Sequence, residues 1–174
     1  MKKLLSILMI VVLAFASMLV FVGCGEESGL PEAPKGYKMY ENDEIYFAYP
    51  ESWTNTEIRG YVQLKPSAGG NNITVAKSQY DSTFDNMTVD TFNQHLLPSL
   101  VQAGASVSNV KVEHDTTKGF DITVVTYDAS YSTISMKQVI YMFKLGEAIY
   151  TISINEVVDD LTLIQTVFNT LAIK

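Results

Sequence analysis

Alternating apolar and polar side chains in the second half of the chain limit its fold more than any other feature of the sequence. Apolar residues occupy every second position of residues 120–124 and 150–154, and Ile134, Met136, Ile140 and Met142 mark one face of residues 134–142. A period of two places successive side chains on opposite faces of a β-strand, so each segment is predicted to be a strand. Residues 145–147 have the length of a tight turn. Consecutive strands joined this closely pair antiparallel.

Shorter alternating stretches in the first half predict further strands. They lie within residues 45–49, 58–64, 73–80 and 107–114, and Gly60 is a candidate bulge in the second of them. The strands therefore outnumber any other element, and most of them follow one another directly along the chain.

Two segments have the apolar period of a helix instead. Residues 88–104 carry a stripe of large apolar side chains, and Pro98 within this segment is predicted to kink or split the helix. A second helix is predicted to begin near Asp159 and Asp160 and to end the chain. Segregated helices and consecutive strands predict an α+β fold, with an antiparallel sheet of about six to seven strands flanked by two helices.

The amino end has the pattern of an export signal. Lys2 and Lys3 precede the apolar run Leu4–Val22, and small residues lead to Cys24, the one cysteine of the chain. Residues 21–24 resemble a lipobox, although Phe21 replaces the usual leucine. We therefore predict cleavage before Cys24 and acylation of its thiol.

The alternative to cleavage is an uncleaved signal anchor. Leu4–Val22 is 19 residues long, which just reaches the length of a membrane-spanning helix. Either interpretation places the domain on the extracytoplasmic face of the cell membrane, since Lys2 and Lys3 stay in the cytoplasm.

These features divide the chain into three predicted parts. Residues 1–23 form a lipoprotein signal peptide, and residues 24–36 comprise the lipidated Cys24 and a flexible tether rich in Gly, Pro and Glu. Residues 37–174 form one α+β domain.

Charge and cysteine content exclude several classes of function. The net charge of −7 includes the two lysines of the leader, so the mature chain is more acidic still and is not expected to bind nucleic acid. With Cys24 acylated, no thiol remains for a disulfide, a thiolate metal site or a cysteine nucleophile.

One stretch carries a family resemblance. Ile45–Trp53 resembles the F-x-Y-P-x-x-W strand and turn of PsbP-like domains, a fold shared with DcrB-like lipoproteins. The hairpin from Gln138–Tyr141 into Ala148–Ile152 and the helix end at Phe168–Leu171 are also similar. The resemblance implies a curved antiparallel sheet sandwiched by helices, used for binding or assembly, without a catalytic residue set common to the family.

Catalytic and metal-binding patterns are missing from the sequence. His95 and His114 have no metal-ligand spacing to a partner, and no G-x-S-x-G motif occurs. Asp81, Asp85 and Asp90 surround a polar loop without the calcium-loop pattern. We therefore predict no catalytic residue, no metal and no cofactor.

Tyrosines provide the candidate binding surface. The chain has ten of them, and several lie opposite the most apolar face, beside Thr and Ser. Tyrosine combines rigid aromatic area with a polar group, as binding surfaces do, and four form the candidate surface. The four are Tyr46, Tyr61, Tyr127 and Tyr141. The alternative is that many tyrosines belong to the core or to covered sheet faces.

The predicted function is a membrane-anchored, non-catalytic binding or assembly module. Its partners would be the membrane, through the lipid anchor, and an unidentified protein or envelope component. One alternative is an extracytoplasmic hydrolase acting on cell-envelope substrates, which requires a pocket that gathers a histidine with carboxylates and a Ser or Tyr. A carrier of ions or small molecules is the other.

Overall fold

The computed structural model describes residues 30–157 and 161–174. The unit Ala33–Lys174 contains all the elements named below. In chain order they are β1 (Tyr37–Glu41), β2 (Ile45–Pro50), β3 (Thr54–Ile58), β4 (Tyr61–Lys65), β5 (Asn72–Gln79), the 3-10 helix η1 (Ser82–Phe84), α2 (Val89–His95), α3 (Leu97–Gln102), β6 (Ser106–Asp115), β7 (Ile122–Tyr131), β8 (Ile134–Leu145), β9 (Ala148–Glu156), α4 (Thr162–Thr170) and β10 (Ala172–Ile173).

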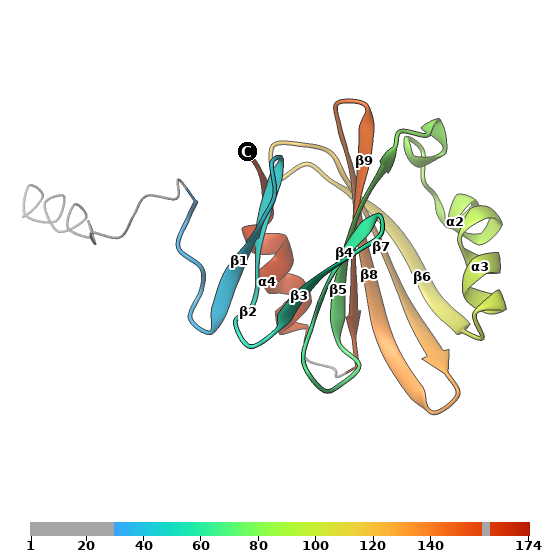
Figure 1. The fold of residues 1–174 in the computed structure, drawn as a ribbon. Coiled ribbons are helices and arrows are strands. Elements are labelled where there is room, and N and C mark those ends of the chain that lie inside the picture. Colours follow the sequence, from blue (N-terminus) through green and yellow to red (C-terminus); the bar gives the residue numbers. More distant parts are fainter. Residues whose placement is uncertain (1–29, 158–160) are drawn as a thin grey trace, which may run out of the picture. The chain divides into compact units, whose positions relative to one another are not determined.

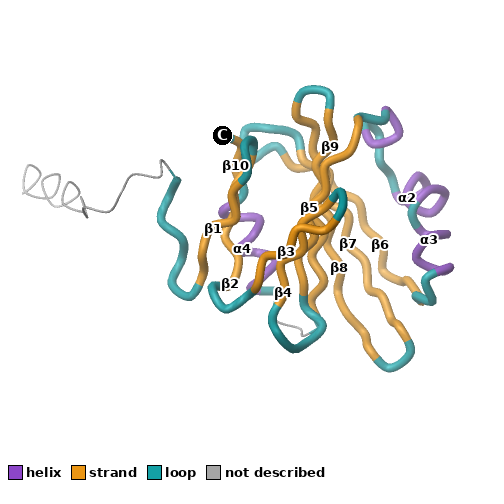
Figure 2. The backbone as a smooth tube through the Cα atoms, viewed as in Figure 1, coloured by secondary structure: helices purple, strands orange, loops and turns teal. Residues whose placement is uncertain are grey.

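Seven strands form the main sheet, in the order β3-β4-β5-β9-β8-β7-β6, and every neighbouring pair is antiparallel. β9 lies between β5 and β8, so it joins the two halves of the sheet (Figures 1 and 2). The predicted α+β fold with an antiparallel sheet of about six to seven strands is confirmed. A second sheet of three strands, β1-β2-β10, was not predicted.

One face of the main sheet carries the larger core. Apolar residues at alternate positions of β4, β5, β8 and β9 pack there against β1, β2 and α4. Ile152 and Ile154 of β9 are fully buried in this cluster, together with Phe47 of β2 and Val167 of α4. We call this side of the sheet the inner face.

The opposite side, the outer face, is covered only in part. Helices α2 and α3 pack over β6, β7 and β8 and bury Phe92, Met142 and Val125. Figure 1 shows both helices at the β6 end of the sheet. The outer side of β4, β5 and β9 contributes no residue to either apolar cluster.

Two local predictions differ from the structure, and a third is confirmed. Gly60 is no bulge, because it lies in the turn between β3 and β4, with φ of 86° and Ile58 paired to Tyr61. The predicted helix over residues 88–104 splits into α2 and α3, as its proline indicates, and Pro98 lies in the first turn of α3. The last helix does not end the chain, because β10 follows it and pairs with β2.

None of the helices in the described residues is long and apolar enough to span a membrane. Cys24, the apolar run before it and the predicted helix start at Asp159 and Asp160 lie outside the described residues.

Candidate functional site

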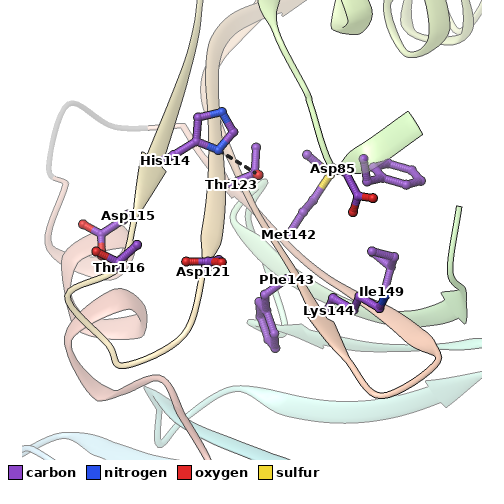
Figure 3. A pocket seen from close by; sticks show the side chains of 11 residues that line it. Asp85, His114, Asp115, Thr116, Asp121, Thr123, Met142, Phe143, Lys144 and Ile149 are labelled. Carbon is purple, nitrogen blue, oxygen red and sulfur yellow. Dashed lines mark hydrogen bonds between the residues drawn. The ribbon is translucent and has the colours of Figure 1, made fainter. Parts of the chain in front are cut away.

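A pocket of about 270 Å³ lies where the turns β6–β7 and β8–β9 approach the loop after η1 (Figure 3). It collects charged and hydroxyl side chains that are distant in sequence. Its lining includes Asp85, His114, Asp115, Asp121, Thr123 and Lys144.

His114 and Thr123 meet because they are directly opposite each other in the β6–β7 pairing. The Nδ1 atom of His114 lies 3.3 Å from the Oγ1 atom of Thr123, as Figure 3 shows. Cross-strand partners on the outer face are close by geometry alone, so this contact needs no further explanation. His114 is exposed.

Two of the three carboxylates that line the pocket accept hydrogen bonds from residues of their own loops. Asp115 accepts hydrogen bonds from the backbone N–H and the hydroxyl of Thr117, at 2.8 Å and 2.6 Å. Asp85 accepts a hydrogen bond from the hydroxyl of Tyr80, and this bond raises the pKa of Tyr80. Nucleophilic catalysis requires a base that a third group orients. In the described residues the hydrogen bond of the His114 ring goes to Thr123 and not to a carboxylate.

The requirement for the hydrolase alternative is therefore met only in part. The pocket gathers His114 with carboxylates, but its hydroxyl groups come from threonines rather than from a Ser or Tyr. His95, the other histidine, is exposed in the last turn of α2 and does not line this pocket. The described residues contain no group of three or more His, Cys, Asp or Glu arranged to hold a metal ion.

The aspartates that surround the loop after β5 have local roles. Asp81 caps η1, accepting from the backbone N–H of Thr83 at 2.9 Å and from its hydroxyl at 2.7 Å. These hydrogen bonds lower the pKa of Asp81. Asp90 lies in the first turn of α2, where negative charge is favourable, and Thr88 caps that helix.

The four tyrosines selected from the sequence do not lie on one surface. Tyr127 and Tyr141 are each 3% exposed, and they point to opposite faces of the main sheet. Burial raises the pKa of both hydroxyls. Tyr46 is half-buried in the small sheet, and Tyr61 is 37% exposed at the β3–β4 turn. Two of the four are thus core residues, because large aromatic side chains fill the spaces under helices α2 and α4.

A different surface has the exposed polar groups that were expected on the tyrosine surface. On the outer face of β4, β5 and β9, six of the residues that alternate with the buried ones are polar and partly exposed. We call this surface the polar face; it consists of Gln63, Asn72, Thr74, Thr151, Ser153 and Asn155. Helices α2 and α3 draw their sheet contacts from β6, β7 and β8, and so leave these strands uncovered.

Hydrogen bonds between side chains order one row of the polar face. Gln138 of β8 donates to Asn155, and Asn155 donates in turn to Asn72 at 3.2 Å. Gln138 is 9% exposed, and its Oε1 atom has no hydrogen-bond partner within the described residues. The alternation of polar residues within 72–76 and 151–155 is visible in the sequence. The row itself depends on the pairing of β5, β9 and β8, which the sequence does not reveal.

Comparison with known proteins identifies the architecture. No protein-family model matches the chain, and no curated protein matches it by sequence. Among solved structures, cyanobacterial PsbP (CyanoP) from Synechocystis sp. PCC 6803 is similar with a TM-score of 0.67 at 15% identity, over 87% of this chain and 99% of that chain. LpqN of Mycobacterium tuberculosis, described as involved in cell envelope biogenesis, has a TM-score of 0.42 at 14% identity, over 79% of this chain and 90% of its own. The order of elements and the similarity to CyanoP together show that this chain has the PsbP-like fold.

Proposed function

We propose that this protein is an exported lipoprotein, held on the extracytoplasmic face of the cell membrane by lipid on Cys24, and that it binds a partner without chemical turnover. The partner is a protein or another component of the cell envelope. The polar face is the observation that carries the binding part of this proposal.

The sequence supports the location. The two lysines, the apolar run Leu4–Val22 and Cys24 follow the order of a lipoprotein signal, and Cys24 is the one thiol available for acylation. A diacylglycerol with an additional acyl chain is sufficient for stable attachment, because two or more chains are needed for it.

The polar face supports recognition rather than catalysis. Its hydroxyl and amide groups are carried on paired strands, so their spacing is fixed by the sheet and little conformational entropy is lost when a partner is bound. Such groups both donate and accept hydrogen bonds, which suits partners rich in polar groups, including peptide backbones and glycans.

The likeness to CyanoP supports the fold and no particular role. One fold serves many unrelated functions, so the argument for binding rests on the surface of this chain.

The experiment that tests the proposal has two arms. In the first, the mature protein is recovered from membranes and its amino-terminal peptide is analysed by mass spectrometry, beside a Cys24→Ser variant. We expect an acylated Cys24 at the new amino terminus of the wild type. The Cys24→Ser variant should carry no lipid. An unmodified thiol with the leader still attached would refute the anchor.

In the second arm, partners are captured by crosslinking in membranes. Ser153→Arg places a long cation at the centre of the polar face, and Ser108→Arg is the matched change on the exposed part of β6. We expect a stoichiometric partner with the wild type and with Ser108→Arg, and its loss with Ser153→Arg. Equal capture by both variants would show that the polar face does not bind the partner.

A further inference from the structure

The register of the main sheet extends the polar face to the β3–β4 hairpin. Tyr61 of β4 is opposite Ala76 of β5, and Ala76 is opposite Thr151 of β9. Gln63, two residues further along β4, begins the neighbouring row of the polar face. Positions two apart on a strand share a face, so Tyr61 belongs to the outer face with them. Because Tyr61 is 37% exposed, an accessible aromatic residue borders the polar face, with a small alanine beside it.

This surface is free of acidic side chains. Within the described strands β3, β4, β5 and β9, the outer positions contain no Asp or Glu, although the chain has 19 of them. Glu57 of β3 is opposite Val62, which packs on the inner face. Lys65, at the end of β4, is the one lysine at these outer positions. The surface therefore fits an uncharged partner, since it offers neither several carboxylates to a cation nor several cations to an anion.

Several polar groups of this surface have no partner inside the protein. Asn155 donates to Asn72, so these two amides are bonded to each other. The side chains of Gln63, Thr151 and Ser153, by contrast, form no hydrogen bond within the described residues, and all three are partly exposed. Polar groups that a sheet holds in place and leaves unbonded are available to a ligand.

The spacing of the strands sets the size and the kind of the ligand. β4 and β9 are separated by β5, so Tyr61 and Ser153 are roughly 10 Å apart across the strands. A single sugar ring cannot reach both, whereas a linear oligomer can. An amphipathic helix would find no apolar stripe on this surface, and an extended peptide adds to the edge of a sheet rather than to its face.

A linear glycan with acetamido groups has the matching chemistry. The C–H groups on the flat side of a sugar ring are attracted to the negative face of an aromatic ring. An acetamido group has one N–H donor and one carbonyl acceptor, which pair reciprocally with the amide of Asn or Gln.

We propose that the polar face binds an uncharged, linear glycan of N-acetylated amino sugars from the cell envelope. One sugar stacks on Tyr61, and Gln63 and Ser153 form hydrogen bonds with the sugars that follow. This inference rests on the proposed function, because it names the class of partner for the same face.

The β-1,4-linked hexamer of N-acetylglucosamine is the probe, and N-acetylglucosamine itself is the control for length. Both are titrated by calorimetry into the full chain in a polyoxyethylene detergent, which carries neither sugar nor charge. We expect the hexamer to bind and the monomer to bind at least tenfold more weakly, because the monomer cannot reach both Tyr61 and Ser153. The affinity for the hexamer should be the same at low and high salt, because the ligand is uncharged.

Four variants test the assigned residues, and thermal unfolding verifies that each is folded at the temperature of the titration. Tyr61→Ala is expected to weaken hexamer binding by roughly two- to tenfold, the range of one aromatic contact. Tyr61→Phe keeps the ring and should retain most of the affinity. Ser153→Arg places a long side chain where the glycan lies and should weaken binding at least tenfold. Glu57→Ala, an exposed position of the same hairpin on the opposite side, should bind as the wild type does.

Absence of hexamer binding at millimolar concentration, equal affinity for the monomer and the hexamer, loss of hexamer affinity at high salt, or wild-type affinity in Tyr61→Ala would each overturn this inference. The titration needs neither acylation nor a partner captured in membranes. If the hexamer does not bind but Ser153→Arg still loses its crosslinked partner, the polar face binds a partner of another class and the proposed function stands. Equal capture by Ser153→Arg and Ser108→Arg would instead refute the proposed function, so the two failures are distinguishable.

Discussion

Ala48 lies in the middle of β2, fully buried, and its backbone N–H is not bonded to a strand. β10 pairs with β2 only at Ile45 and Tyr46, so the edge of β2 beyond them lacks a strand partner. The hydroxyl of Thr170, at the end of α4, accepts from the N–H of Ala48 at 2.8 Å and donates to the carbonyl of Thr166 at 2.7 Å. One side chain thus completes a helix end and a sheet edge together.

Thr170→Val keeps the shape of this side chain and removes its hydroxyl. The buried N–H of Ala48 is then left without a partner, which we expect to lower the free energy of unfolding by about 1–3 kcal/mol. Urea denaturation measures the change. Thr170→Ser retains the hydroxyl and should lose less; a valine variant as stable as the wild type would contradict this role for the hydrogen bond.

At the scale of single residues, the sequence indicates which residue types a binding surface contains, but not which of those residues lie on the surface. Tyr127 and Tyr141 have the residue type of a binding surface, but the decision between surface and core depends on which strands α2 and α4 cover. That information is tertiary. The sequence shows the alternating polar residues within 72–76. It does not show that helices α2 and α3 leave this part of the sheet uncovered.

The β3–β4 hairpin shows why the predicted bulge at Gly60 is wrong. An isolated glycine within an alternating stretch is compatible with a bulge and with a two-residue turn, and both restore the alternation afterwards. The structure has the turn, with Gly60 at φ of 86°. By contrast, β8 and β9 were predicted well, because their alternation is long and residues 145–147 between them are too few for anything except a turn.

Gly60→Ala tests the conformational demand of this hairpin. No atom lies within 4 Å of the position that a Cβ would occupy, so crowding is not the issue. The left-handed backbone conformation costs an alanine about 1–2 kcal/mol, and we expect thermal unfolding to reflect that loss. Arg59→Ala, at the neighbouring exposed position, should change stability by less than about 0.5 kcal/mol. If the two substitutions have the same effect, the backbone of Gly60 is not the cause.

At the scale of the molecule, Glu44 joins the two sheets. It belongs to the β1–β2 turn of the small sheet, while Lys77 and Tyr150 belong to β5 and β9 of the main sheet. Hydrogen bonds from Lys77 first, and from Tyr150 second, lower the pKa of Glu44 below its ordinary value of 4.5.

A carboxyl whose pKa is lower in the folded state stabilises the fold above its ordinary pKa, and this contribution disappears as the pH falls through the lowered value. As the pH is lowered below 4.5, the unfolding temperature of the wild type is expected to fall. The unfolding temperature of Glu44→Gln should fall less. Asp43→Asn, on the same turn, is the control and should follow the wild type. Parallel pH profiles for the wild type and Glu44→Gln would contradict the contribution of this carboxylate.

The pairing of β10 with β2 has a consequence for the order in which the chain can fold. Ala172 is opposite Tyr46, so most of the folded domain separates the two partners along the chain. A chain that emerges from a ribosome or a translocation channel, amino end first, presents β2 long before its far neighbour exists. Closure of so long a loop is slow and comes late. The small sheet can therefore be completed only after Ala172 and Ile173 have emerged, although the pairing of β1 with β2 needs nothing beyond Pro50.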